Sequence, residues 1–249
     1  MPISAFCCGG VGRVAAVLIN VVLVLAGSFL GLLLKSRFSQ RLGQAVMSAL
    51  ALCTVGIGLS TLLKTENSLC VILCMVAGTL LGEWIGIEKR MDGMGEFLRR
   101  KLVRGEGSSR FVEGFVTATV LYCVGAMAIN GSIQAGLNHD YAVLVSKSVM
   151  DGVSAITFAA ALGLGVAFSA VPILLYEGAL TLLAGVVGPY LSPAVITEMS
   201  AVGGAIIVGI AFNMMGLGRE KIRVGNMLPA IFLPMVYLPL AEWLGTLLS

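Results

Sequence analysis

A small set of ionisable, amide and hydroxyl side chains stands inside or beside long apolar stretches of this sequence. Two carboxylates, three amides and one hydroxyl make up the set: Asn20, Ser132, Gln134, Asp151, Glu177 and Asn226. Ionisable groups within a membrane are costly to bury and mark ion sites or proton relays, and amide oxygens can replace part of an ion's hydration shell. We therefore predict that these side chains approach one central cavity that binds a small ion or polar solute, with both carboxylates setting a preference for cations.

Asp151 and Lys147 follow a polar segment with two glycines at residues 130–136 (NGSIQAG). The two charged residues are four positions apart, so a helix would place them on one face, where an ion pair stabilises the helix. The alternative is that the glycines let the chain re-enter the membrane, since irregular backbone at that depth must lie within protein or line a cavity. In that case Ser132, Gln134 and Asp151 line an aqueous vestibule.

Glu177 lies five residues after Pro172, in a continuously apolar stretch. An isolated carboxylate there either binds a proton or cation, hydrogen-bonds a neighbouring helix in its neutral form, or reaches the cytoplasmic interface. Asn226 precedes Pro229, which frees a backbone carbonyl and predicts a kinked or discontinuous helix. Unwound carbonyls of this kind hold Na⁺ in transporters. Otherwise Asn226, like Asn20, forms a hydrogen-bonded contact between helices.

The composition is too apolar for a soluble protein. Apolar residues make up 58% of the 249 residues and charged residues 12%, with a mean hydropathy of +0.99. A soluble domain is nearer about 45–50% apolar and about 25% charged. The 32 glycines suit close helix packing in lipid. We predict an all-α polytopic membrane protein. The net charge of +3 carries little information about nucleic acid, and we expect no nucleic-acid partner. The six cysteines indicate no disulfide framework.

Apolar stretches long enough to cross a bilayer alternate with links that carry the charges. The predicted spans are residues 13–34, 43–63, 68–87, 111–129, 152–169, 171–191, 199–216 and 225–247, with Pro172 separating the fifth and sixth. Lys and Arg gather in the links after the first, third and seventh spans, and such links are cytoplasmic. Both termini are therefore predicted to lie outside. Residues 88–110 form the connector after the third span, which is either an amphipathic helix on the inner leaflet or a solvated loop.

A short sequence occurs twice, about 152 residues apart: MSA at 47–49 before VGIGL at 55–59, and MSA at 199–201 before VGIAF at 208–212. The charge distribution gives the two copies opposite orientations. Inverted repeats are typical of secondary transporters, although chance echoes in sequence rich in Gly, Ala, Val and Leu are the alternative. The predicted architecture is one transmembrane domain, 1–249, with a first repeat at 13–87, middle spans at 111–169 and an inverted repeat at 171–247.

Motifs of common enzyme classes are missing from the sequence. It has no GxxxxGK[ST], HExxH or GxSxG motif and a single histidine, His139, so we expect no enzyme, no cofactor and no bound metal. The leading hypothesis is a secondary transporter or channel-like permease, whose partners are the lipid bilayer and a small ion or polar solute. The alternative is a non-transporting scaffold or regulatory subunit. A protomer of 25.8 kDa is compatible with a homodimer.

Several motifs along the chain together match one known family. They are Asn20 with Gly27-Ser28, GAMAI at 125–129 with GSIQ at 131–134, Lys147-Ser148 with Asp151, FAAALGLGVAFS at 158–169, Tyr176-Glu177-Gly178 and NMLPA at 226–230. On these residues the chain resembles the YqgA-like family of bacterial inner-membrane proteins, the domain of unknown function numbered 554, from about residue 13 to 247. The resemblance implies an inner-membrane location and no particular reaction.

The chain departs from the pattern of that family at two places. The family more often has Gln where this chain has Glu177, and a Gly-Thr pair where this chain has Ala16-Val17. A hydrogen-bonding group at position 177 fits both Gln and Glu. The frequent Gln at this position in the family therefore weighs against a required carboxylate and against a proton-carrying role for Glu177.

Overall fold

The protein is helical throughout the part of the chain that its computed structural model describes. Residues 3–35, 40–90, 93, 108–218 and 220–248 are described, and no β-strand occurs among them. The class predicted from composition, an all-α polytopic membrane protein, agrees with this architecture. Most of the predicted connector at 88–110 lies outside the described residues.

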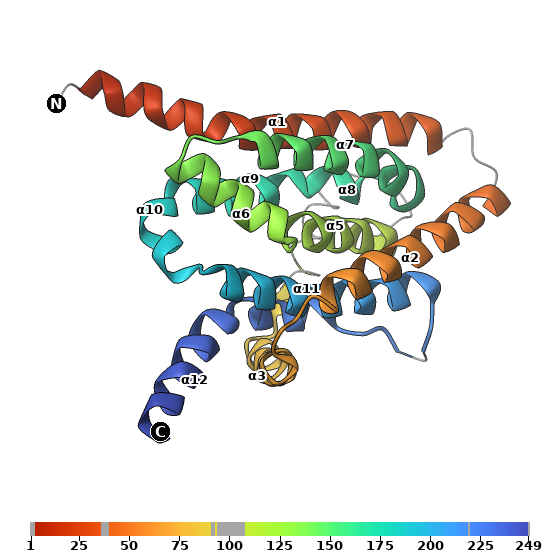
Figure 1. Ribbon diagram of the computed structural model, residues 1–249. Coiled ribbons are helices and arrows are strands. Elements are labelled where there is room, and N and C mark those ends of the chain that lie inside the picture. Colours follow the sequence, from red (N-terminus) through yellow and green to blue (C-terminus); the bar gives the residue numbers. More distant parts are fainter. Residues whose placement is uncertain (1–2, 36–39, 91–92, 94–107, 219, 249) are drawn as a thin grey trace. The chain divides into compact units, whose positions relative to one another are not determined.

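The chain divides into two compact units, whose helices are labelled in Figure 1. Unit 1 comprises residues 1–47 and 102–189, and unit 2 comprises residues 48–101 and 190–249. The helices of unit 1 are α1 (Ile3–Lys35), α5 (Ser108–Cys123), α6 (Ala126–Leu137), α7 (Ala142–Leu162), α8 (Gly165–Phe168), α9 (Ala170–Leu182) and α10 (Ala184–Val187). Unit 2 holds most of α2 (Gln40–Leu62), together with α3 (Ser68–Ile85), α11 (Pro193–Met215), η2 (Val224–Phe232) and α12 (Pro234–Leu248). A short helix, η1 (Gly188–Tyr190), lies at the boundary in sequence.

Six described helices are long and apolar enough to cross a membrane, or up to eight spans if each of two bent helix pairs counts as one. The bent pairs are α5 with α6, at 57°, and η2 with α12, at 45°. The second pair contains Pro229 inside a 3-10 helix, so the predicted irregularity of the last span is present. The first pair bends before Ala126, and residues 130–136 continue as regular helix within α6.

The boundary between the fifth and sixth predicted spans is wrong. The α7 helix covers Ala142–Leu162 and ends at Gly163, whose φ of 89° is a conformation that favours glycine. Pro172 does not break the chain, because it lies in the first turn of α9, where a missing N–H leaves no hydrogen bond unmade. Span five therefore begins about ten residues earlier than predicted, and it includes Lys147 and Asp151.

Glycines set the distance between α1 and α7 in unit 1. A Cβ atom at Gly27 would lie 2.1 Å from the carbonyl oxygen of Gly152, and one at Gly31 would lie 2.2 Å from the carbonyl oxygen of Ile156. From the first contact to the second, the residue number increases by four on both helices. The α1 and α7 helices therefore run parallel, side by side (Figure 1). Helices without side chains at the contact approach closely, as is typical of packing in lipid.

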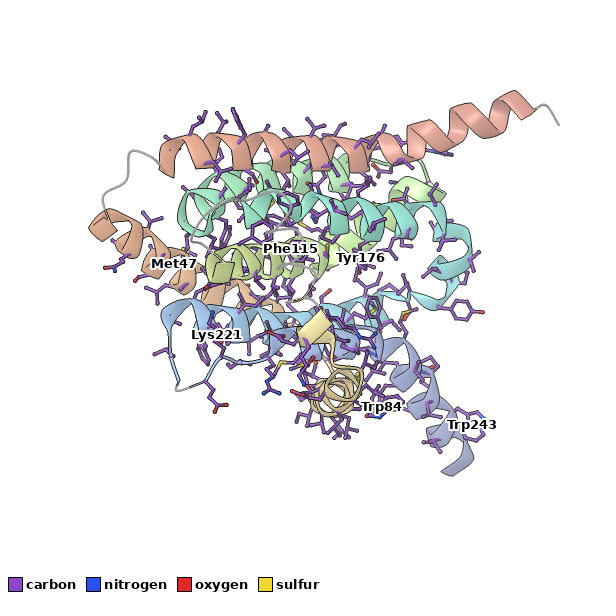
Figure 2. All side chains as sticks on the ribbon, turned by 180° about the vertical axis from the view of Figure 1, so that it is seen from behind. Met47, Trp84, Phe115, Tyr176, Lys221 and Trp243 are labelled. Atoms are coloured by element: carbon purple, nitrogen blue, oxygen red, sulfur yellow. The ribbon has the colours of Figure 1, made fainter. Side chains whose placement is uncertain are left out.

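Glycines also allow close contacts between helices in unit 2. Gly58 of α2 packs on Gly204 of α11, and a Cβ at Gly78 of α3 would lie 2.3 Å from Cα of Ala230 in η2. Large apolar side chains on the outer faces remain exposed, including Trp84 on α3 and Trp243 on α12 (Figure 2). Exposed apolar surface of this extent indicates contact with lipid.

Replacing Gly27 by alanine tests the close contact between α1 and α7. We expect Gly27→Ala to lower the free energy of unfolding by about 1–3 kcal/mol, because the new methyl group meets backbone that cannot rotate away. Gly178→Ala in α9 is the matched control, since a Cβ there meets nothing within 4 Å. The control is expected to be neutral or slightly stabilising. Equal losses in both variants, measured by denaturant titration in mixed micelles, would contradict this packing.

Candidate functional site

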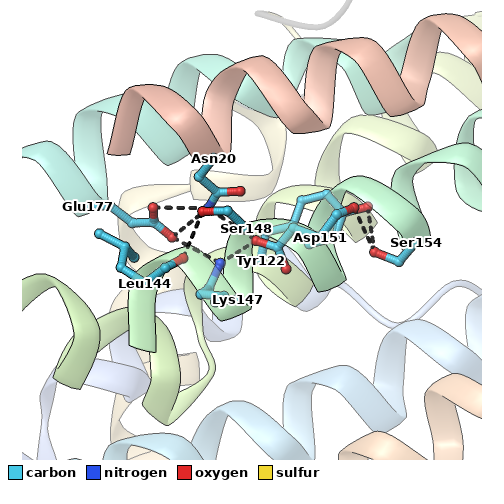
Figure 3. A network of polar contacts seen from close by, with 8 residues as sticks. All are labelled: Asn20, Tyr122, Leu144, Lys147, Ser148, Asp151, Ser154 and Glu177. Atoms are coloured by element: carbon cyan, nitrogen blue, oxygen red, sulfur yellow. Dashed lines mark hydrogen bonds and ion pairs between the residues drawn. The ribbon is translucent and has the colours of Figure 1, made fainter. Parts of the chain in front are cut away.

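Three helices of unit 1 direct charged and amide side chains toward one another in the interior. Asn20 comes from α1, Lys147 and Asp151 from α7, and Glu177 from α9 (Figure 3). We call these four residues the buried polar cluster. Lys147 and Asp151 share one helix face because they are four residues apart. Asn20 reaches them because α1 lies along α7 at glycine contacts.

The cluster is tightly connected and closed from solvent. Nζ of Lys147 lies 2.9 Å from Oε1 of Glu177 and also forms an ion pair with Asp151. The amide nitrogen of Asn20 donates to both carboxylate oxygens of Glu177, at 3.1 and 3.0 Å, and to Oδ2 of Asp151 at 3.2 Å. Asn20 and Glu177 are 0% exposed, Lys147 is 5% exposed and Asp151 is 8% exposed.

The charges of the cluster do not cancel. With every group ionised, two carboxylates face one ammonium group, which leaves one net negative charge within the cluster. A buried charge without compensation is strongly unfavourable. The amide of Asn20 offsets part of the cost by donating hydrogen bonds, but it carries no charge. One further positive charge, either a proton or a monovalent cation, would make the cluster neutral.

Hydroxyl groups extend the polar region toward α5. The Ser154 hydroxyl donates to the hydroxyl of Tyr122 at 3.2 Å, and it also lies 2.9 Å from the backbone carbonyl of Asp151. One hydroxyl proton serves only one of these acceptors at a time. Tyr122 is 1% exposed, so this second layer is enclosed as well. It links the α7 backbone beside the cluster to α5.

The structure brings together three of the six residues that the sequence singles out: Asn20, Asp151 and Glu177. Ser132 in α6 is fully buried, and its Oγ atom has no hydrogen-bond partner among the described residues. Gln134 instead donates to Oδ1 of Asn130 at 3.2 Å on its own helix. Asn226 belongs to unit 2, where its Oδ1 accepts from the backbone N–H of Glu88 at 2.7 Å.

Two further buried charged residues are not among the six that the sequence singles out. The sequence indicates Lys147 only as the partner of Asp151 in a helical ion pair, because the predicted fifth span begins after both residues. Its spacing from Asp151 was the available signal. Glu198 in unit 2 is 2% exposed and accepts hydrogen bonds from the Thr65 hydroxyl at 2.7 Å and from the backbone N–H groups of Glu66 and Asn67. It ties the link between α2 and α3 to α11.

The cysteines of α3 form no metal site with other described residues. Sγ atoms of Cys70 and Cys74 lie 3.8 Å apart within the helix, and both residues are buried. Within the described ranges, no group of three or more His, Cys, Asp or Glu residues could hold a metal ion. This pair packs as small apolar side chains.

Removing the ammonium group tests the electrostatics of the cluster. We expect Lys147→Met to lower the free energy of unfolding by about 3–5 kcal/mol at neutral pH, because it leaves two buried carboxylates without a counter-ion. Lys64→Met, at an exposed lysine, is the matched control and is expected to change stability little. The combined variant Lys147→Met, Glu177→Gln should recover part of the loss. A loss below about 1 kcal/mol for Lys147→Met, the range of a surface pair, would argue against the buried pairing.

Comparison with known proteins agrees with a membrane location. The family model described as "Protein of unknown function (DUF554)" matches residues 15–238. The chain is 28% identical to uncharacterized membrane protein YdfK of Bacillus subtilis over 221 residues, covering 87% of this chain and 92% of YdfK. It is 30% identical to uncharacterized protein YqgA of Escherichia coli over 220 residues, covering 87% and 93%. No solved structure matches it. The chain therefore belongs to the family of membrane proteins of unknown function DUF554.

Proposed function

We propose that this protein is a small secondary transporter or channel-like permease for a small ion or polar solute, and not an enzyme. The observation that carries the proposal is the buried polar cluster, in which two carboxylates share one ammonium group. Charged residues that face the interior of a helical bundle commonly mark the path of an ion or a proton. A surplus negative charge is what a cation site needs.

The origin of the cluster in separate helices also supports transport. Asn20, Lys147 and Glu177 belong to α1, α7 and α9, so a shift of one helix changes several contacts at once. Small shifts of packed helices can switch a protein between discrete arrangements. The closed cluster corresponds to an occluded state, from which access to either side requires such a shift.

We further propose a bacterial inner-membrane location, both termini outside, and an inverted repeat. Each predicted pair of repeat-related helices is in contact: α1 packs against α9, Gly58 of α2 against Gly204 of α11, and α3 against η2. The parallel direction of α1 and α7 is consistent with two odd-numbered spans that both run inward. Basic links after the first, third and seventh spans support the same orientation.

A non-transporting scaffold is the second candidate, and the observation that supports it is the pairing of both carboxylates within the cluster. Lys147 contacts both carboxylates, and Asn20 donates to both as well. Such a network can serve only to hold α1, α7 and α9 in one arrangement, because buried ion pairs can specify helix register. This candidate predicts a stable protein that carries nothing across a membrane.

Flux measurements in liposomes separate the two candidates. Purified protein is reconstituted and screened with Na⁺, K⁺, Li⁺, protons and small polar solutes. We expect flux above that of protein-free liposomes for at least one of them. Because Asp151 and Glu177 supply the negative charge, Asp151→Asn and Glu177→Gln should reduce that flux by at least about tenfold, equivalent to about 1.4 kcal/mol of interaction.

Exposed carboxylates provide matched controls for these two variants. Asp140→Asn and Glu242→Gln make the same chemical changes at exposed positions of the chain and should leave flux unchanged. Folding of each variant is checked by thermal unfolding in detergent. Well-folded protein without flux for any solute tested would favour the scaffold.

A further inference from the structure

Unit 1 contains buried oxygen atoms that no described residue satisfies. Among the described residues, the buried side-chain atoms without a hydrogen-bond partner all lie in this unit: Asn20 Oδ1, Ser28 Oγ, Thr119 Oγ1, Ser132 Oγ and Thr181 Oγ1. Buried oxygens in folded proteins almost always have a partner, because leaving one unpaired is costly. Three of these atoms belong to the buried polar cluster or to helices that form or contact it: Asn20 Oδ1 in α1, Thr181 Oγ1 in α9 and Ser132 Oγ in α6.

Two of the three belong to helices that already contribute to the cluster. Asn20 donates its amide N–H groups to Glu177 and Asp151, and its carbonyl oxygen Oδ1 remains unpaired on the same side-chain amide. Thr181 is four residues after Glu177 in α9, so its hydroxyl lies on the same helix face, one turn away. Thr181 is 1% exposed.

The third atom reaches the level of Glu177 through helix register. α6 and α9 both run antiparallel to α7, so they run parallel to one another (Figure 1). A Cβ at Gly136 of α6 would lie 2.3 Å from the carbonyl oxygen of Thr181. Four residues earlier on each helix stand Ser132 and Glu177, which places Ser132 at the height of the carboxylate. Ser132 is 0% exposed.

The chemistry of these atoms distinguishes a metal cation from a proton. A carboxylic acid proton needs one acceptor, whereas a cation stripped of its water needs several oxygen ligands, such as carboxylates, carbonyls and hydroxyls. Asp151 and Glu177 supply carboxylates, Asn20 supplies an amide carbonyl, and Ser132 and Thr181 supply hydroxyls. The set is composed entirely of hard oxygen ligands, which suit alkali and alkaline-earth cations.

The net charge of these ligands and Lys147 favours a cation that carries one positive charge. Lys147 neutralises one of the two carboxylates, so one monovalent cation completes neutrality. A divalent cation would leave a buried excess of positive charge, which is unfavourable.

We propose that the buried polar cluster binds one desolvated monovalent cation of the sodium class. Asp151 and Glu177 supply the charge, and Asn20 Oδ1 with the hydroxyls of Ser132 and Thr181 complete the ligand set. Lys147 serves as a fixed internal cation that limits the site to one added charge. This inference rests on the proposed function and identifies the ion of that transport, either as cargo or as the coupling ion.

Binding is tested without any requirement for transport. Thermal unfolding of the purified protein in detergent is followed during titration with NaCl, LiCl, KCl, MgCl₂ or choline chloride at constant ionic strength and pH. We expect a saturable rise in Tm with NaCl or LiCl, because a ligand of the folded state stabilises it. Choline chloride and MgCl₂ should produce no such rise.

Variants of the neutral ligands make the test specific. Ser132→Ala and Thr181→Val each remove one oxygen and should raise the apparent Kd for Na⁺ by about tenfold, the equivalent of about 1.4 kcal/mol. Ser146→Ala and Thr157→Val are matched controls, since these exposed hydroxyls donate to carbonyls of their own helix. Both controls should leave the Kd unchanged. Glu177→Gln should abolish the Na⁺-dependent rise, provided that its Tm in choline chloride shows it to be folded.

Several results would overturn the proposal. They are the absence of a saturable rise with NaCl or LiCl, equal stabilisation by NaCl and choline chloride, or a Kd unaffected by both Ser132→Ala and Thr181→Val. The outcome is separable from that of the proposed transport. Specific Na⁺ binding without any flux supports the cation site and rejects transport, whereas flux of another solute without Na⁺ binding rejects the cation site and supports transport.

Discussion

The ammonium group of Lys147 lies between two carboxylates in the interior of an apolar helical bundle. Charges in such surroundings interact strongly, and an unpaired one is severely unfavourable. Asp151 is available from the same helix, but Glu177 and Asn20 must be brought from two other helices. The arrangement of α1, α7 and α9 is therefore constrained by the need to compensate one lysine. The remaining negative charge is the basis of the cation site that we propose.

Glycine contacts next to the polar residues determine whether the cluster can form. Gly152 directly follows Asp151, and its carbonyl oxygen lies 2.1 Å from where a Cβ at Gly27 would stand, so a backbone contact between α1 and α7 is adjacent in sequence to the carboxylate. Gly136 performs the same role between α6 and α9, where it meets the carbonyl of Thr181. Helices that touch through backbone have little freedom to slide without steric overlap. Close packing and polar chemistry are thus coupled at the same positions.

Polar residues in the two units are satisfied in different ways. In unit 2, Glu198 accepts from backbone N–H groups of the link between α2 and α3, and Asn213 makes two hydrogen bonds to the backbone of Ile222. These hydrogen bonds hold the segments between helices against α11, which is a structural role. In unit 1, the partners that the structure gives Asp151 and Glu177 are side chains of Asn20 and Lys147. Side chains can rearrange without unfolding a helix, which suits an exchangeable ligand.

The sequence by itself determined the helical membrane class, the approximate positions of most spans and the family, and it singled out Asn20, Asp151 and Glu177, which the structure brings together. Apolarity and charge are local properties that add along the chain, so they can be read without coordinates. Only the tertiary structure decided that α7 begins early enough to bury Lys147, and that Gly136, one turn after Ser132, meets the carbonyl of Thr181, one turn after Glu177. Those outcomes depend on helix register, which is set by backbone contacts at a few glycines. The four-residue spacing of Gly27 with Gly31 and of Gly78 with Gly82 is a local sign of close helix packing. Nothing local indicates which residues of another helix each of these glycines meets.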